Sequence, residues 1–155
     1  MVIDEVDRKI VEYLQNDGST SDVKLASLLG VSDSTARRRR LRLIEEDVIR
    51  VVAVANPFKL GFEVIAIIGI IVTRNMLQQV ESALVLMPHV RFVGATLGRY
   101  SLMVEAWFKS SEEFLQFMTA SLAQVEGIQQ TEAFQIMRLS KYAYDWGKPQ
   151  VALGP

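Results

Sequence analysis

Residues 62–72 form the most apolar stretch of the chain, and they constrain its fold more than any other segment. The stretch is rich in isoleucine and valine, which favour strands, and it is too short to span a bilayer as a helix. A strand with no polar side is typical of a sheet that is covered on both faces. One side carries Val64, Ala66, Ile68 and Ile70, and the other carries Ile65, Ile67 and Ile71. We therefore expect this strand to lie in a sheet that is apolar on both faces, each of which has to be covered by other parts of the protein.

The segments after this strand predict the order βαββαβ. Residues 75–87 have helical spacing of apolar residues, and residues 90–97 and 100–109 form a strand pair about a Gly98-Arg99 turn. A capping box of Ser110 and Glu113 begins a second helix, which ends at Gly127, and residues 128–142 form the last strand. With right-handed crossovers, this order gives a ferredoxin-like antiparallel sheet with both helices on one face.

The face away from the helices then stays bare, although it is apolar. Met103 and Trp107 join the isoleucines of the first strand there, and a soluble monomer seldom leaves such a face in water. We predict a homodimer through this sheet face. Glu105 interrupts the apolar pattern, and a buried carboxylate needs a partner. Three interpretations remain open for it: a pair across the dimer, an effector contact, or a wet sheet edge.

The first third of the chain predicts three short helices. The first follows Asp4, the second lies between Ser21 and Gly30, and the third runs from the cap Ser32 to about Asp47. Two helices joined by a tight glycine turn are the signature of a helix-turn-helix motif.

The third helix carries an unusual run of arginines, residues 37–40, followed by Arg42. The net charge of the whole chain is −1, so attraction to nucleic acid has to be local. A solvated basic helix face is the alternative, but the run lies on the helix that reads DNA in this motif. We predict contacts with phosphates and base edges of double-stranded DNA from the residues Ser32, Ser34, Thr35, Arg37, Arg38, Arg39 and Arg42.

The composition argues against other kinds of chemistry. There is no cysteine and only one histidine, so we expect no disulfide, no metal centre and no cofactor. No nucleophile with a base, carboxylate pair or phosphate loop stands at a useful spacing, so we expect no enzyme. No secretion signal or membrane span is evident, which favours a cytoplasmic protein.

Short motifs along the whole chain resemble the leucine-responsive/asparagine-operon (Lrp/AsnC) family of regulators. They are Asp4, Asp7 and Ile10; Leu14, Gln15, Asp17 and Gly18; Leu25 and Ala26; Gly30, Val31 and Ser32; Arg39, Leu43 and Ile49; Asn56 and Pro57; and Leu60 and Gly61. The resemblance implies a helix-turn-helix joined by a short strand to a ligand-responsive domain, and dimers that assemble further into octamers.

The resemblance also implies an amino-acid effector near a Gly-x-Tyr/Phe-Asp turn between dimers. The matching positions are Gly98, Arg99, Tyr100 and Ser101. Ser101 stands where the family has an aspartate that pairs with an ammonium group. Arg40 replaces an apolar residue of the family, and Asp47 replaces a glycine that ends the helix.

Together these patterns predict an α+β chain and a sequence-specific DNA-binding transcriptional regulator. We expect a helix-turn-helix (winged-helix-like) domain over residues 1–48, a linker strand over 49–61, a ferredoxin-like effector and dimerisation domain over 62–142 and a tail over 143–155. The alternative function is a small-molecule-sensing or RNA-binding ferredoxin-like module without operator-specific DNA binding.

Overall fold

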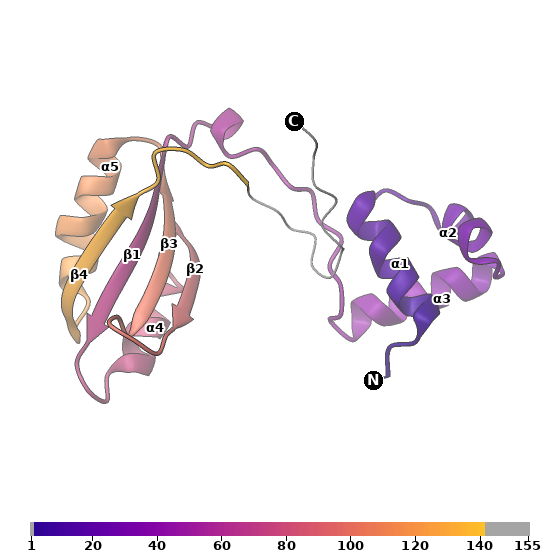
Figure 1. Cartoon of the computed structure of the whole chain (residues 1–155), viewed down its shortest axis with the longest axis horizontal. Helices are drawn as coiled ribbons and strands as arrows, with labels where there is room; N and C mark the ends of the chain where they lie inside the picture. The colour runs from indigo at the N-terminus through magenta and orange to yellow at the C-terminus, as the bar shows by residue number, and fades with distance from the viewer. Residues whose placement is uncertain (1, 142–155) are drawn as a thin grey trace. The chain divides into compact units, whose positions relative to one another are not determined.

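The computed structural model describes residues 2–141, which form two compact units that divide after Val54 (Figure 1). The predicted tail over residues 143–155 and residue 142 of the last predicted strand lie outside the described residues. That strand was expected over residues 128–142, but it ends at Gln135. Within the described part of the chain, no helix combines the length and the apolar character needed to cross a membrane.

The first unit contains three helices, α1 (Glu5–Asn16), α2 (Asp22–Leu29) and α3 (Asp33–Glu45). The three predicted N-caps are confirmed: the side chains of Asp4, Ser21 and Ser32 each accept a hydrogen bond from a backbone N–H of the first turn. Gly30 ends α2 with a left-handed φ of 67°. The helices enclose a core of Ile10, Leu14, Leu25, Ala26, Ala36 and Leu43.

At the end of α3 the chain turns through Asp47, which has a φ of 55°. The N–H groups of Asp47 and Val48 bond to the carbonyls of Ile44 and Leu43, as in a left-handed helix end. Glycine adopts this backbone without cost, whereas a residue with a Cβ is strained there. Asp47, which replaces a helix-ending glycine of the family, is therefore strained at this position.

The connector after α3 differs from the prediction. Residues 48–56 form neither helix nor strand, although a linker strand was expected over residues 49–61. A strand exists only where a second strand accepts its hydrogen bonds, and the described chain supplies none here. Val51, Val52 and Val54 are consequently exposed. A short 3₁₀ turn, Phe58–Leu60, precedes the sheet.

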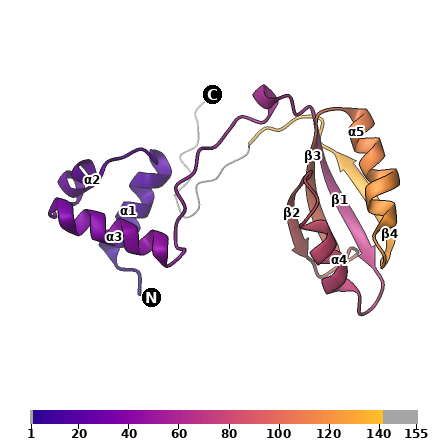
Figure 2. The ribbon, with the colours of Figure 1, turned by 180° about the vertical axis from the view of Figure 1, so that it is seen from behind.

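The second unit has the predicted ferredoxin-like order. The antiparallel sheet has the strand order β2-β3-β1-β4, with bounds β1 (Val64–Val72), β2 (Val90–Ala95), β3 (Leu102–Phe108) and β4 (Ile128–Gln135). Helix α4 (Leu77–Leu84) and helix α5 (Ser111–Gln116) cover the same face of the sheet (Figures 1 and 2). Helix α5 continues through a π-helical turn, Phe117–Ser121, and a 3₁₀ turn, Leu122–Gln124.

The two faces of β1 divide as the alternation predicted. Val64, Ala66, Ile68 and Ile70 are buried under the helices, against Val80, Leu84, Phe108 and Phe117. Residue pairs across antiparallel strands share a face, so the register places Ile65 beside Trp107, Ile67 beside Glu105 and Gly69 beside Met103 on the opposite face. We call this side, with Phe92 and Phe134, the open sheet face.

Glu105 lies inside the open sheet face and not at its edge. Its strand, β3, lies between β2 and β1, with Phe92 and Ile67 as neighbours in register. The side chain accepts a hydrogen bond of 2.5 Å from Nε1 of Trp107. The interpretation of Glu105 as a residue of a wet sheet edge is therefore wrong, because the central position of β3 removes it from any edge.

Candidate DNA interface and effector pocket

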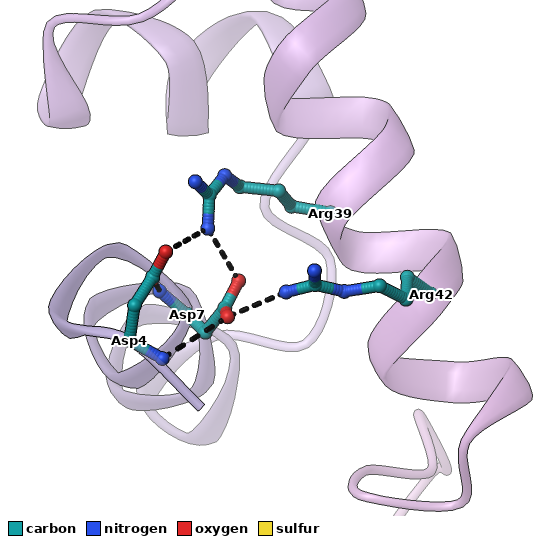
Figure 3. Close-up of polar contacts among 4 residues, drawn as sticks. All are labelled: Asp4, Asp7, Arg39 and Arg42. Carbon is teal, nitrogen blue, oxygen red and sulfur yellow. Dashed lines mark hydrogen bonds and ion pairs between the residues drawn. The ribbon is translucent and has the colours of Figure 1, made fainter. Parts of the chain in front are cut away.

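Asp7 is the buried centre of a charged network between α1 and α3 (Figure 3). Its Oδ1 lies 2.9 Å from Nη1 of Arg39, and its Oδ2 lies 2.5 Å from Nη2 of Arg42. Arg39 also contacts Asp4, with 2.6 Å between Nη1 and Oδ2. Residues three apart on a helix share a face, so both arginines point toward α1.

This network fixes the orientation of α3. It also means that the arginines of α3 are not all equally free to bind another molecule. The backbone N–H of Asp7 and the guanidinium of Arg39 hold the pKa of Asp4 below its usual value. In return, the carboxylates of Asp4 and Asp7 raise the pKa of Arg39. Each charge is therefore matched within the unit, and α1 is tied to α3 by ionic hydrogen bonds.

Arg40 makes a second link, from α3 to the first residue of α2. Its Nε and Nη2 donate to the two carboxylate oxygens of Asp22 at 2.6 and 3.0 Å. The bond to Arg40 lowers the pKa of Asp22 below its usual value. The family usually has an apolar residue at this position, and an apolar side chain cannot bind Asp22. The arginine that replaces it in this chain therefore has a specific structural partner.

The remaining arginines of the run are the outward ones. Arg37 and Arg38 are exposed, and neither forms an ion pair or hydrogen bond with another residue of the described chain. Ser34 is exposed beside them. Their guanidinium groups are thus available to an anionic partner.

The hydroxyl groups at the start of α3 cap the helix and are also partly exposed to solvent. Ser32 Oγ accepts from the N–H of Thr35 at 3.3 Å and donates to Thr35 Oγ1 at 2.8 Å. Ser32 and Ser34 are exposed, and Thr35 is half-buried. The seven residues predicted for DNA contacts therefore separate into three groups: four that are exposed, the half-buried Thr35, and two, Arg39 and Arg42, that face α1.

The sequence prediction missed the acidic partners of the arginines. Asp4 and Asp7 were noted at the start of the first helix, Asp22 was not singled out, and none of the three was predicted as a partner of α3. The available signal was the crowding of acids at the start of the chain and of arginines at residues 37–42. That signal indicates attraction between the two segments, but it does not say which arginine meets which carboxylate.

The predicted effector turn lies between β2 and β3, with Tyr100 on the open sheet face. A Cβ at Gly69 would approach the Tyr100 ring to 2.7 Å, so the ring rests directly on that glycine. The Tyr100 hydroxyl donates to Glu132, and this bond raises the pKa of Tyr100. Arg99 lies over the same ring and 3.3 Å from a carboxylate oxygen of Glu132.

A pocket opens beside this turn. Its lining residues are Val72, Thr73, Arg74, Asn75, Leu77, Thr96, Leu97, Gly98, Tyr100 and Ser101. Three of the four predicted effector residues line it, and Arg99 does not. Ser101 Oγ accepts the N–H of Val72 at 3.1 Å, which fixes the turn to the end of β1. Among residues 2–141, no three acidic or histidine side chains are grouped to hold a metal ion.

A helix-turn-helix with an outward basic helix, followed by a ferredoxin-like unit with a pocket, defines a class of ligand-responsive DNA-binding regulators. Models of protein families agree: an AsnC-type helix-turn-helix domain matches residues 3–44, and an Lrp/AsnC ligand binding domain matches residues 65–145. The chain belongs to the Lrp/AsnC family of transcriptional regulators and is not an enzyme. Proteins of this family bind DNA and form oligomers.

Relatives of similar length support this assignment. The chain is 33% identical over 144 residues to an uncharacterized HTH-type transcriptional regulator of Pyrococcus furiosus, a match that covers 92% of this chain and 97% of the relative. It is also 33% identical over 141 residues to the HTH-type transcriptional regulator FL11 of Pyrococcus furiosus, covering 90% of this chain and 93% of that one.

Solved structures share the fold. Escherichia coli AsnC aligns with a TM-score of 0.85 at 24% identity, covering 92% of this chain and 97% of AsnC. A complex of the Neisseria meningitidis regulator NMB0573 with L-methionine aligns with a TM-score of 0.85 at 20% identity, covering 92% and 95%.

Proposed function

We propose that the protein is a sequence-specific regulator that reads double-stranded DNA as a dimer and responds to a small effector bound beside residues 98–101. The observation that carries this proposal is the division of the arginine run on α3. Three arginines are matched by carboxylates of the same unit, and Arg37 and Arg38 face solvent without a partner in the described chain. Exposed guanidinium groups on a recognition helix are suited to phosphates and to guanine edges.

In this proposal the α3 side chains have two roles. Ser34, Arg37 and Arg38 contact DNA, with Ser32 and Thr35 at the helix start, where hydroxyl and backbone N–H groups suit phosphate. Arg39 and Arg42 act mainly through position: bound to Asp7, they set the angle of α3 against α1. Arg42 keeps 42% of its side chain exposed, so its terminal guanidinium nitrogens can also reach a phosphate, whereas its Nε is buried.

The open sheet face supports the dimer in the proposal. It presents the half-buried Ile67 next to the exposed rings of Phe92 and Phe134, whereas Ile65 and Trp107 are already buried within the chain, with Phe58 and Phe62 against the Trp107 ring. An apolar face of this kind is suited to the same face of a second copy, which brings two recognition helices onto one near-palindromic site. Assembly of dimers into octamers follows the family resemblance and is part of the proposal.

The effector site of the proposal comprises Gly98, Arg99, Tyr100 and Ser101. The pocket beside the turn and the docking of Tyr100 on Gly69 support a preformed site. The Neisseria regulator was solved with L-methionine, which supports a small effector for this chain as well.

The test compares outward and inward arginines in one assay. We expect Arg37→Ala and Arg38→Ala to weaken DNA binding with unchanged unfolding, either flattening the salt slope by about one or costing about 1–3 kcal/mol on the cognate site. Arg39→Ala should lower stability, because it leaves Asp4 without an arginine partner and Asp7 with Arg42 alone. Lys9→Ala on α1 removes the same charge elsewhere in the unit and serves as the control.

Two results would contradict the proposal. One is unchanged DNA affinity and salt slope in both Arg37→Ala and Arg38→Ala. The other is tighter binding of single-stranded RNA than of duplex DNA, which would support the alternative function of a ferredoxin-like RNA-binding module.

A further inference from the structure

The pocket beside residues 98–101 has an unusual balance of charge. Its lining contains one cation, Arg74, together with the amide of Asn75 and the hydroxyls of Thr73, Thr96 and Ser101. None of the lining residues in the described chain is an aspartate or a glutamate. We propose that the effector is a carboxylate that lacks an α-ammonium group, such as a 2-oxo acid, and that Arg74 binds its carboxylate. This inference rests on the proposed effector role of the pocket.

Arg74 is free to bind an anion. Its side chain is exposed, and no residue of the described chain forms an ion pair or hydrogen bond with it. The backbone around it is held in place, because the N–H of Thr73 bonds to Gly127 at 2.8 Å and the N–H of Met76 bonds to Thr73 at 3.1 Å. The loop backbone is thus ordered, and a guanidinium matches a planar carboxylate through two parallel hydrogen bonds.

The hydroxyl groups add a donor and an acceptor, but no negative charge. Ser101 Oγ accepts the N–H of Val72, so its own O–H can be donated to a ligand. Thr96 Oγ1 already donates to the carbonyl of Tyr100 at 2.6 Å and offers only lone pairs. The side-chain donors that remain for a ligand oxygen are those of Thr73, Arg74, Asn75 and Ser101.

The carboxylate bonded to a lining residue is Glu132, and it is already satisfied. It accepts from the Tyr100 hydroxyl and lies 3.3 Å from Arg99, whose charge matches it. Within one chain, an ammonium group in the pocket would find no free carboxylate, and it would meet the charge of Arg74. A carbonyl oxygen at the same place would meet hydroxyl and amide donors.

Isothermal titration of the full-length protein with matched ligand pairs tests this inference. The pairs are 4-methyl-2-oxopentanoate with L-leucine, 2-oxoglutarate with L-glutamate, and pyruvate with L-alanine; 3-methylbutylamine is the cation without a carboxylate. For at least one pair we expect the 2-oxo acid to bind about tenfold or more tightly than the amino acid, the scale of one charged hydrogen bond. Tighter or equal binding of the amino acid in every pair overturns the inference, as does binding of none of the 2-oxo acids.

Two variants locate the site. Arg74→Met should weaken the 2-oxo acid about tenfold or more, and Ser101→Asp should reverse the preference toward the amino acid, because it adds the missing carboxylate. Arg138→Gln removes a charge from an exposed residue outside the pocket and should leave the affinity unchanged. Equal affinities in Arg74→Met and the native protein would overturn the role of Arg74.

The same preparation separates this inference from the proposed function. If the protein binds DNA but binds no 2-oxo acid, the inference about the effector is wrong and the proposed function as a DNA-binding regulator stands. A bound 2-oxo acid without DNA affinity would overturn the proposed DNA recognition and support the ligand class.

Discussion

Arg40 of α3 holds Asp22, the first residue of α2, through two hydrogen bonds of 2.6 and 3.0 Å. The two side chains are 26% and 22% exposed, so water screens the pair only in part. The geometry is bidentate, which is the stronger form of an arginine–carboxylate pair. The pair therefore fixes the two helices of the motif to each other.

We expect Arg40→Met to reduce the free energy of unfolding by about 1 kcal/mol, since partly screened pairs are worth little more. A double-mutant cycle with Asp22→Asn, measured by urea unfolding, isolates the pair. The coupling energy should account for most of the loss. A coupling near zero would show that Arg40 contributes by packing alone.

Asp7 has a larger expected effect, because its side chain is fully buried. Asp7→Asn removes the charge that binds Arg39 and Arg42, and we expect a loss of about 2 kcal/mol or more in unfolding free energy. DNA affinity should fall as well, because α3 loses its anchor on α1. Glu5→Gln on the same helix is the control, since Glu5 is 82% exposed. Similar stability of the two variants would argue against the network.

The lowered pKa values of Asp4 and Asp22 predict a loss of stability in acid. A carboxyl group with a folded-state pKa below its unfolded value stabilises the fold at pH values above about 4, the usual unfolded pKa. This stabilisation is lost as the pH falls from about 4 through the lowered pKa values. Urea unfolding from pH 7 down to pH 3 should show the decline, with a shallower slope in Asp22→Asn. An equal slope in the variant would contradict a role for Asp22.

Replacing Asp47 by glycine should stabilise the helix-turn-helix unit. Asp47 has a φ of 55°, which glycine adopts without strain. The variant also loses the exposed ion pair with Arg50, at 2.9 Å, but such pairs contribute little. We expect a rise of a few degrees in Tm by calorimetry. Arg50→Gln removes only the ion pair and separates the two effects; a lower Tm for Asp47→Gly would mean that the ion pair dominates.

Gly69 should be intolerant of a side chain because of Tyr100. A Cβ at this position would lie 2.7 Å from ring atoms, so Gly69→Ala should cost about 1–3 kcal/mol and disturb effector binding. Removal of the ring relieves the clash, and Gly69→Ala should therefore cost much less in a Tyr100→Ala background. Equal costs in both backgrounds would show that the clash is relieved elsewhere.

Much of the fold followed from local patterns. The caps of the three N-terminal helices, the left-handed end of α2 at Gly30 and the two faces of β1 depend on residues within a few positions of each other. Periodicity and capping are properties of one element, so they are readable before any element has a neighbour. The right-handed crossover rule then left one arrangement for the βαββαβ order.

The charged site followed from the sequence only in part. The composition of α3 indicated an anionic partner, but the choice between DNA and Asp7 for each arginine depends on the angle at which α1 packs on α3. Residues 39 and 42 point toward α1 and residues 37 and 38 point away, which is a matter of helix rotation in the packed unit. The central place of Glu105 likewise depends on strand order.

The sequence by itself determined the family, the helix-turn-helix, the ferredoxin-like order and the apolar second face of the sheet. Each of these follows from patterns of residues that lie close together in the sequence. Only the tertiary structure decided that Asp7 binds Arg39 and Arg42, that Arg37 and Arg38 remain outward, and that Tyr100 rests on Gly69. These contacts join residues 30 or more positions apart. Long-range packing geometry sets such contacts, and no local pattern encodes it.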